Sequence, residues 1–249
     1  MFIKVRKGLS IAASTAILGA VLLTGCGGSS KDSADDEPTL KTISGVAIDG
    51  YIEDATVTAG GSSTTTDANG AWSITYTPTA DTTDVVSVKG GVDTATGEVF
   101  EGVLKAPVGE EGEEVVVTPL TTLVTSLVEK GTSKAAAETK IAQQLGIPAS
   151  ILVADPIAML KTGNATQRAD AASAIKKALV VQKTAETMAE SVASGEDAES
   201  TMEAVMDAVM DAVMDIVADK LDSGESFDDI MENTAEISTE VAVEVADEV

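Results

Sequence analysis

Between residues 42 and 118, apolar and polar residues alternate in short runs, and this pattern predicts β-strands. Trp72, Ile74 and Tyr76 occupy every second position of one run, with serine or threonine between them. A period of two with one apolar face is typical of a strand that is packed on one side and exposed to water on the other. Similar runs extend from Val46 to Ile48, Ala55 to Val57, Val85 to Val88 and Val115 to Val117. Short strands at this spacing predict a small antiparallel β-sandwich.

The period changes at Thr118-Pro119, where the pattern becomes helical. Threonine is a favourable N-cap, and proline is favoured at the first helical position. The apolar positions that follow lie on one helix face: Leu120, Leu123, Val124, Leu127 and Val128. Gly131 is expected to end this helix. Residues 119–249 are therefore predicted to form an alanine-rich, all-α domain, which makes the fold class α+β.

Capping residues and glycines divide the rest of the chain into further helices. These are expected from Ser133 to Leu145, from Asp155 to Gly163 and from Asn164 to about Ser194. The long third helix has an expected apolar side made of Ala172, Ile175, Leu179, Met188 and Val192. Ser226 and Asp229 have the spacing of a capping box and predict a last helix. Residues 237–249 also alternate at Val241, Val243 and Val245, so a strand stays open as the alternative there.

A four-residue repeat of methionine, an acid, a small or branched residue and valine begins at Met202, Met206, Met210 and Met214. Four residues advance an α-helix by about 400°, so the methionine and valine rows together sweep roughly 220° around it. An ordinary surface helix has an apolar stripe of about 100°. We therefore expect this helix to be packed on more than one side, at the centre of its domain or against a partner.

Two kinds of chemistry are open for this repeat. Methionine thioethers bind Cu(I), but each methionine here is coupled to a valine as core packing requires, so packing is favoured over a metal site. The acidic positions are Glu203, Asp207, Asp211, Asp215 and Asp219. Such a row is most often a solvated face, and one hypothesis is that it docks against Lys176, Lys177 and Lys183.

The N-terminus has the order of a bacterial export signal. Lys4, Arg6 and Lys7 precede an apolar or small-residue run from Leu9 to Leu23. A run of about 15 residues is short for a bilayer span, which needs about 20. Cys26 is the one cysteine of the chain and follows this run after Thr24 and Gly25.

Leu23-Thr24-Gly25-Cys26 resembles the lipobox of bacterial lipoproteins. The resemblance implies that signal peptidase II recognises Leu23, Thr24 and Gly25, that the Cys26 thiol receives a diacylglycerol group, and that the new amino group is acylated. Several acyl chains would make the attachment effectively permanent. Gly27 stands where lipoproteins kept at the inner membrane often carry aspartate, so the resemblance favours the outer membrane.

Within the β region, Thr66-Asp67-Ala68-Asn69-Gly70-Ala71-Trp72-Ser73-Ile74 resembles the hairpin of the carboxypeptidase-regulatory-like, prealbumin-type β-sandwich found in bacterial surface proteins. Gly70 suits the positive φ of such a turn, and Asp67 can cap it. Relatives that bind calcium often carry an acidic loop where this chain has Gly60-Gly61-Ser62-Ser63. This difference disfavours calcium binding.

Composition narrows the function classes. The chain has 249 residues, a net charge of -25, no histidine and 2% aromatic residues. Such a charge repels phosphate backbones, so nucleic-acid binding is excluded. The lack of histidine excludes Ser-His-Asp catalysis and histidine-ligated zinc. A carboxylate-based hydrolase stays open as an alternative, because the many acidic residues could supply a catalytic pair.

The sequence therefore predicts a signal peptide (1–25), an acylated acidic tether (26–41), a β-sandwich domain (42–118) and a helical domain (119–249). We expect a non-enzymatic lipoprotein, anchored in the outer membrane and facing the periplasm or the cell surface. Its expected role is interaction, adhesion or an accessory function with protein partners of the envelope, with no cofactor. The alternatives are a metal-binding envelope protein, through copper or calcium, and the hydrolase.

Overall fold

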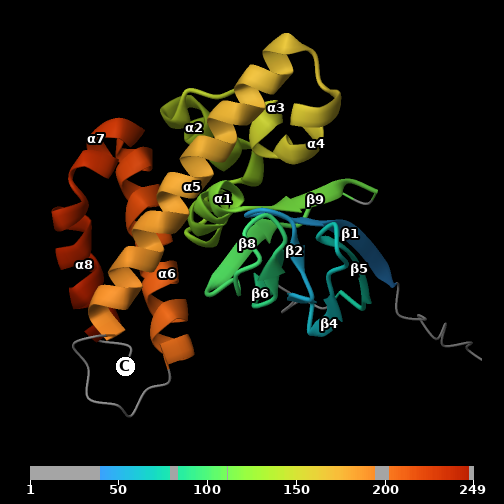
Figure 1. Ribbon diagram of the computed structural model, residues 1–249, viewed down its shortest axis with the longest axis horizontal. Helices are drawn as coiled ribbons and strands as arrows, with labels where there is room; N and C mark the ends of the chain where they lie inside the picture. Colours follow the sequence, from blue (N-terminus) through green and yellow to red (C-terminus); the bar gives the residue numbers. More distant parts are fainter. Residues whose placement is uncertain (1–39, 79–83, 111, 194–201, 247–249) are drawn as a thin grey trace, which may run out of the picture. The chain divides into compact units, whose positions relative to one another are not determined.

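The structure is a computed structural model that describes residues 40–78, 84–110, 112–193 and 202–246 (Figure 1). These residues belong to one compact unit, Pro38–Val249. Strands occupy its N-terminal part and helices its C-terminal part, so the fold class is α+β, as the sequence predicts. Among the described helices, none has the length and apolar character that crossing a membrane requires.

The strands in the described part of the chain form three sheets. Their bounds are β1 (Lys41–Ala47), β2 (Ile52–Glu53), β3 (Thr56–Ala59), β4 (Ser62–Thr65), β5 (Ala71–Tyr76), β6 (Val85–Lys89), β7 (Val92–Asp93), β8 (Val103–Pro107) and β9 (Glu114–Val117). The strand orders are β5-β1-β9, β2-β7 and β4-β3-β6-β8. β4 and β8 were not evident in the alternation, because β4 is all serine and threonine and β8 is interrupted by Lys105.

One strand pairing corrects the sequence prediction. β1 pairs with β5 in the antiparallel sense, but it pairs with β9 in the parallel sense, with Gly45 opposite Val115. The prediction of a purely antiparallel arrangement is therefore wrong at this pair. β9 leads directly into α1, and the long stretch of chain between β1 and β9 allows the two strands to run in the same direction.

The predicted faces of β5 are confirmed. Trp72, Ile74 and Tyr76 are at most 5% exposed, whereas the residues between them are exposed. They pack in one apolar cluster with residues of the four-stranded sheet, including Val57, Val88 and Leu104. Gly45 lies opposite Trp72, and a Cβ atom there would be 2.6 Å from the indole ring and 1.9 Å from the Val115 carbonyl oxygen.

The helices are α1 (Pro119–Glu129), α2 (Lys134–Leu145), α3 (Ala149–Leu152), α4 (Pro156–Thr162), α5 (Ala165–Ala193), α6 (Met202–Ser223), α7 (Phe227–Glu232) and α8 (Thr234–Ala246). The predicted caps at Thr118, Asp155 and Ser226 are confirmed, since each side chain accepts a backbone N–H of the first turn. Ser133 occupies the N-cap position of α2, but its side chain makes no capping hydrogen bond. The last segment is helical through Ala246, in two pieces that meet at Asn233.

The predicted apolar side of α5 is wrong at two positions. Ala172 is exposed and Leu179 is 48% exposed. The prediction is confirmed at Met188, which is buried. The other buried positions are Ala171, Ala174, Val181, Gln182, Ala185 and Ala189. The sequence reading gave weight to bulky residues, whereas small alanines let this helix approach its neighbours closely. The side chain of Val192 lies outside those that the structure describes.

Helix α6 lies at the centre of the helices, as the width of its apolar surface predicts. It contacts α1, α2, α5, α7, α8 and strand β8. Its buried side chains are Val209, Met210, Ala212, Val213, Met214, Val217, Ala218 and Leu221.

Candidate functional site

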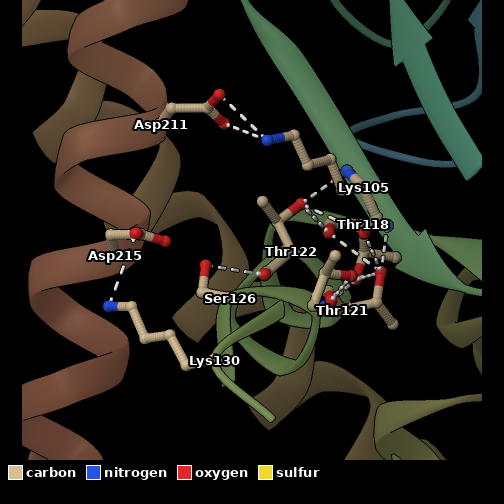
Figure 2. A network of polar contacts seen from close by, with 9 residues as sticks. Lys105, Thr118, Thr121, Thr122, Ser126, Lys130, Asp211 and Asp215 are labelled. Carbon is tan, nitrogen blue, oxygen red and sulfur yellow. Dashed lines mark hydrogen bonds and ion pairs between the residues drawn. The ribbon is translucent and has the colours of Figure 1, made fainter. Parts of the chain in front are cut away.

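The acidic row of α6, here Asp207, Asp211, Asp215 and Asp219, pairs with lysines of the strands and of the end of α1. Asp207 pairs with Lys89 at the end of β6. Lys105 Nζ of β8 lies 2.8 Å from Asp211 Oδ1 (Figure 2). The remaining two aspartates share one lysine, Lys130, at 3.4 Å from Asp215 and 2.8 Å from Asp219.

These contacts correct the hypothesis about which lysines the row meets. Lys176, Lys177 and Lys183 belong to α5, whereas the described ion pairs of these four aspartates are with Lys89, Lys105 and Lys130. Lys177 lies over the ring of Phe227, and Lys183 pairs with Glu186. Lys89 and Lys105 stand in strands and Lys130 stands at a helix end, and no pattern in the sequence indicates that α6 crosses them.

The ion pairs keep Lys105 and Lys130 charged. Burial by itself would lower the pKa of Lys105, but the hydrogen bond to Asp211 and the charge of that carboxylate outweigh it and raise the pKa. The pKa of Lys130 is raised in the same way, against its partial burial, by Asp219 and Asp215. Three lysines therefore offset most of the charge of the four aspartates within the chain, which indicates a structural role.

Hydroxyl groups at the start of α1 complete this network (Figure 2). The Lys105 backbone N–H donates to Thr122 Oγ1 at 2.9 Å, and Thr121 Oγ1 donates to the Lys105 carbonyl oxygen at 3.1 Å. The Thr118 N–H donates to Thr121 Oγ1 at 2.8 Å, and Ser126 Oγ donates to the Thr122 carbonyl oxygen. Threonine side chains thus fasten the first turn of α1 to the edge strand β8.

The methionines of the repeat lie in two groups. Met210 and Met214 are fully buried in the helical core, among side chains such as Val213 and Leu221. The side chains of Met202 and Met206 lie outside those that the structure describes. Within the described residues, no group of three or more acidic or cysteine side chains is arranged to hold a metal ion. Burial in an apolar cluster favours packing as the role of Met210 and Met214.

A cavity of about 110 Å³ lies between two loops of the strand region and one side of α5. Asp49 and the Asp93–Phe100 loop line it on one side, and Leu179, Gln182 and Glu186 line it on the other. Asp49 is the first residue of the Asp49-Gly50 turn. Asp93 fixes its own turn, because its two carboxylate oxygens accept the Ala95 N–H at 2.8 Å and the Thr96 hydroxyl at 3.1 Å.

Asp49 has the most unusual titration of the described residues that line this cavity. Burial, followed by the charges of Asp93 and Glu186, raises its pKa from 3.8 to about 7, while the charge of Lys183 opposes the rise. A carboxyl that titrates near neutral pH is the property that the hydrolase alternative requires. However, glycoside hydrolysis needs a second carboxyl directed at the substrate, and Asp93 and Glu186 both accept hydrogen bonds within the chain.

The sequence reading did not identify this cavity. Asp49 stands in a turn without a catalytic motif around it, and Gln182 lies in a helix whose predicted apolar side did not include it. A buried polar residue on α5 could have been suspected only after Ala174, Val181 and Ala185 were recognised as the buried face.

The predicted lipobox residues Leu23, Thr24, Gly25 and Cys26 lie outside the described residues. Compared with protein-family models, with curated proteins and with solved structures, the chain matches none of them.

Proposed function

We propose that this chain is a bacterial lipoprotein that is attached to the outer membrane through Cys26 and acts without catalysis as an interaction module of the cell envelope. The observation that carries the proposal is the position of the one cysteine, directly after a basic and apolar export signal and two small residues. β1 begins at Lys41, fifteen positions after Cys26. A segment of that length reaches at most about 50 Å, so the folded unit would stay close to the membrane.

The charge of the processed chain suggests the kind of partner. Removal of residues 1–25 takes away the three positive charges of Lys4, Arg6 and Lys7 and changes the net charge from -25 to -28. An anionic unit is repelled by anionic lipid headgroups and attracts basic protein surfaces. We therefore propose a basic protein partner, whose capture by crosslinking in intact cells should fall steeply as salt is added.

Metabolic labelling with an alkyne-tagged palmitate tests the anchor. The natural chain should be labelled and should remain with the outer membrane, and Cys26→Ser should be unlabelled. A matched control carries Cys26→Ser together with Ser29→Cys, which keeps one thiol but moves it away from the lipobox. Labelling of this double variant would show that acylation does not depend on the lipobox and would overturn the proposal.

We also propose that the three-stranded and four-stranded sheets stack face to face as a sandwich, as the resemblance to carboxypeptidase-regulatory-like modules implies. Support comes from the shared apolar cluster, which includes Ile43 and Ile74 of one sheet and Val57 and Val88 of the other. Facing sheets are spaced about 10 Å apart, so methyl groups of the two inner faces touch. Nuclear Overhauser effects between Ile74 and Val57 or Val88 methyl groups test this arrangement, and their absence would contradict it.

A further inference from the structure

Two of the residues that line the cavity, Asp49 and Gln182, each carry a buried side-chain oxygen that has no hydrogen-bond partner among the described residues. These atoms are Asp49 Oδ1 and Gln182 Oε1. Gln182 is only 2% exposed, and its amide nitrogen is already used, because it donates to Glu186 Oε1 at 3.2 Å. A buried acceptor without a donor is costly, so a ligand that brings N–H or O–H donors into this cavity would be stabilised.

The charge around the cavity selects a cation. Among the described residues, the acidic side chains of Asp49, Asp93, Glu98 and Glu186 line it, against the one ammonium group of Lys183. Lys183 Nζ lies 2.6 Å from Glu186 Oε2 and offsets that carboxylate. A negative surplus is left on the side of Asp49, where the two unpaired oxygens can accept hydrogen bonds from a positively charged donor.

The rest of the cavity wall is apolar. Phe100 is buried, and Val99 and Leu179 are 68% and 48% exposed at the rim. A volume of about 110 Å³ holds three or four groups of the size of a water molecule, at roughly 30 Å³ each. A bare divalent ion would not use these side chains, whereas a short methylene chain would contact them.

We propose that this cavity binds a primary alkylammonium group, with Asp49 Oδ1 and Gln182 Oε1 accepting its N–H bonds and Val99, Phe100 and Leu179 contacting its methylene groups. The group has two chemical sources, a free aliphatic amine and the side chain of a lysine on another protein. The proposal does not depend on lipid attachment, because all residues that form the cavity belong to the folded unit.

Isothermal titration calorimetry on the full-length chain in detergent tests the site with n-propylammonium chloride. Tetramethylammonium is the matched control, because it has the same charge and no N–H donor. We expect saturable binding of propylammonium with one site per chain, and binding of tetramethylammonium that is weaker by about tenfold or more. Equal binding of the two cations would show only attraction to an anionic protein and would overturn the proposal.

Variants separate the hydrogen bonds from the charge. Gln182→Leu keeps the net charge and should weaken propylammonium binding by about tenfold, as should Asp49→Asn. Glu232→Gln removes one charge at an exposed position of α7 and should change binding by less than about twofold. If Asp49→Asn and Glu232→Gln weaken binding equally, the cavity is not the site. Putrescine represents a free aliphatic amine, and N-acetyl-lysine methylamide represents the lysine side chain of another protein. The compound that binds more tightly identifies the source of the alkylammonium group.

Labelling of Cys26 and binding of propylammonium give independent results. A chain that is not acylated but binds propylammonium would overturn the anchor alone. An acylated chain that does not distinguish propylammonium from tetramethylammonium would overturn the cavity alone.

Discussion

Lys105 and Asp211 lie 106 positions apart in the sequence, and Lys105 Nζ contacts both carboxylate oxygens of Asp211, at 2.8 and 2.9 Å. The pair joins β8 to α6. The Lys105 side chain is 20% exposed and the Asp211 side chain is 49% exposed, so water screens the pair only in part. The backbone N–H and carbonyl oxygen of Lys105 also form hydrogen bonds with the hydroxyl groups of Thr122 and Thr121 in α1. The elements β8, α6 and α1 therefore meet at Lys105.

Removal of the Asp211 charge should weaken this junction. Asp211→Asn is expected to lower the free energy of unfolding by about 1 kcal/mol at low salt and by less at high salt, because exposure and ions reduce the attraction. Urea unfolding of Asp211→Asn, Lys105→Met and the double variant gives the coupling, expected at about 0.5 to 1 kcal/mol. Asp228→Asn, at an exposed position of α7, controls for the loss of one negative charge from an acidic protein. A coupling indistinguishable from zero would contradict a role of the pair in stability.

The titration of Asp49 predicts how stability depends on pH. Its pKa is about 7 in the folded chain and 3.8 when unperturbed, so the folded state holds this proton more tightly than the unfolded state. The contribution to stability is therefore present below pH 4 and is lost as the pH rises to about 7. A shift of this size bounds the loss at about 4 kcal/mol, since each unit corresponds to 1.36 kcal/mol.

Asp49→Asn should remove this dependence. The charged groups around Asp49 are Asp93, Glu98, Glu186 and Lys183, and they are unchanged in the variant. We expect the variant to gain stability relative to the natural chain between pH 4 and pH 8, by about 1 kcal/mol or more. The measurement is urea unfolding at several pH values. A difference between the two chains that stays constant across this range would show that Asp49 does not titrate there.

Thr121 should contribute more to the free energy of unfolding than the exposed threonines of the helices. Its hydroxyl accepts the Thr118 N–H and lies 3.1 Å from the Lys105 carbonyl oxygen, all at buried or half-buried positions. Thr121→Val keeps the shape but leaves the buried Thr118 N–H without this acceptor, while the Lys105 carbonyl oxygen keeps the Thr122 hydroxyl as a donor. We expect a loss of about 1 to 3 kcal/mol in the free energy of unfolding. Thr139→Val, on the exposed side of α2, loses one hydroxyl bond to a helix carbonyl and should change stability by less than about 0.5 kcal/mol.

Local signals in the sequence were sufficient for β1, β3, β5, β6 and β9, for several helix ends and for the central place of α6. Proline and an N-cap at Thr118-Pro119 act within one turn, and the width of the apolar surface of α6 is a property of one helix. The partners of the acidic row were not predictable, because the contact between Lys105 and Asp211 depends on how β8 and α6 cross. The cavity at Asp49 was missed for the same reason, since its lining comes from two loops and from α5.

The parallel pairing of β1 with β9 shows a further limit. Alternation reports which face of a strand is buried, and it carries no information on the direction of a neighbour about 70 residues away. The apolar face of α5 was misplaced because alanines, which give a weak hydrophobic signal, form most of it.

Met210 and Met214 are predicted to act through packing. Met214→Ala should lower the free energy of unfolding by about 2 to 5 kcal/mol, because it leaves a cavity in the core, whereas Met214→Leu should cost less than about 1.5 kcal/mol. Replacement of all four methionines, Met202, Met206, Met210 and Met214, by leucine should leave the response to Cu(I) unchanged. A stoichiometric loss of Cu(I) binding in that variant would instead support the copper alternative.

Gly45 of β1 is predicted to tolerate no side chain, because two strands and an indole ring lie close to it. It lies opposite Trp72 on β5 and Val115 on β9, and a Cβ atom there would stand 1.9 Å from the Val115 carbonyl oxygen. A contact with backbone cannot be relieved by a side-chain rotation, so Gly45→Ala must separate β1 from β9. We expect a loss of about 3 kcal/mol or more in the free energy of unfolding, measured with urea, at the upper end of single substitutions.

Gly61→Ala is the matched control, because its Cβ would meet no atom within 4 Å and its φ of +78° alone should cost about 1 kcal/mol. Equal losses for the two variants would mean that β1 and β9 do not approach as closely as the structure shows.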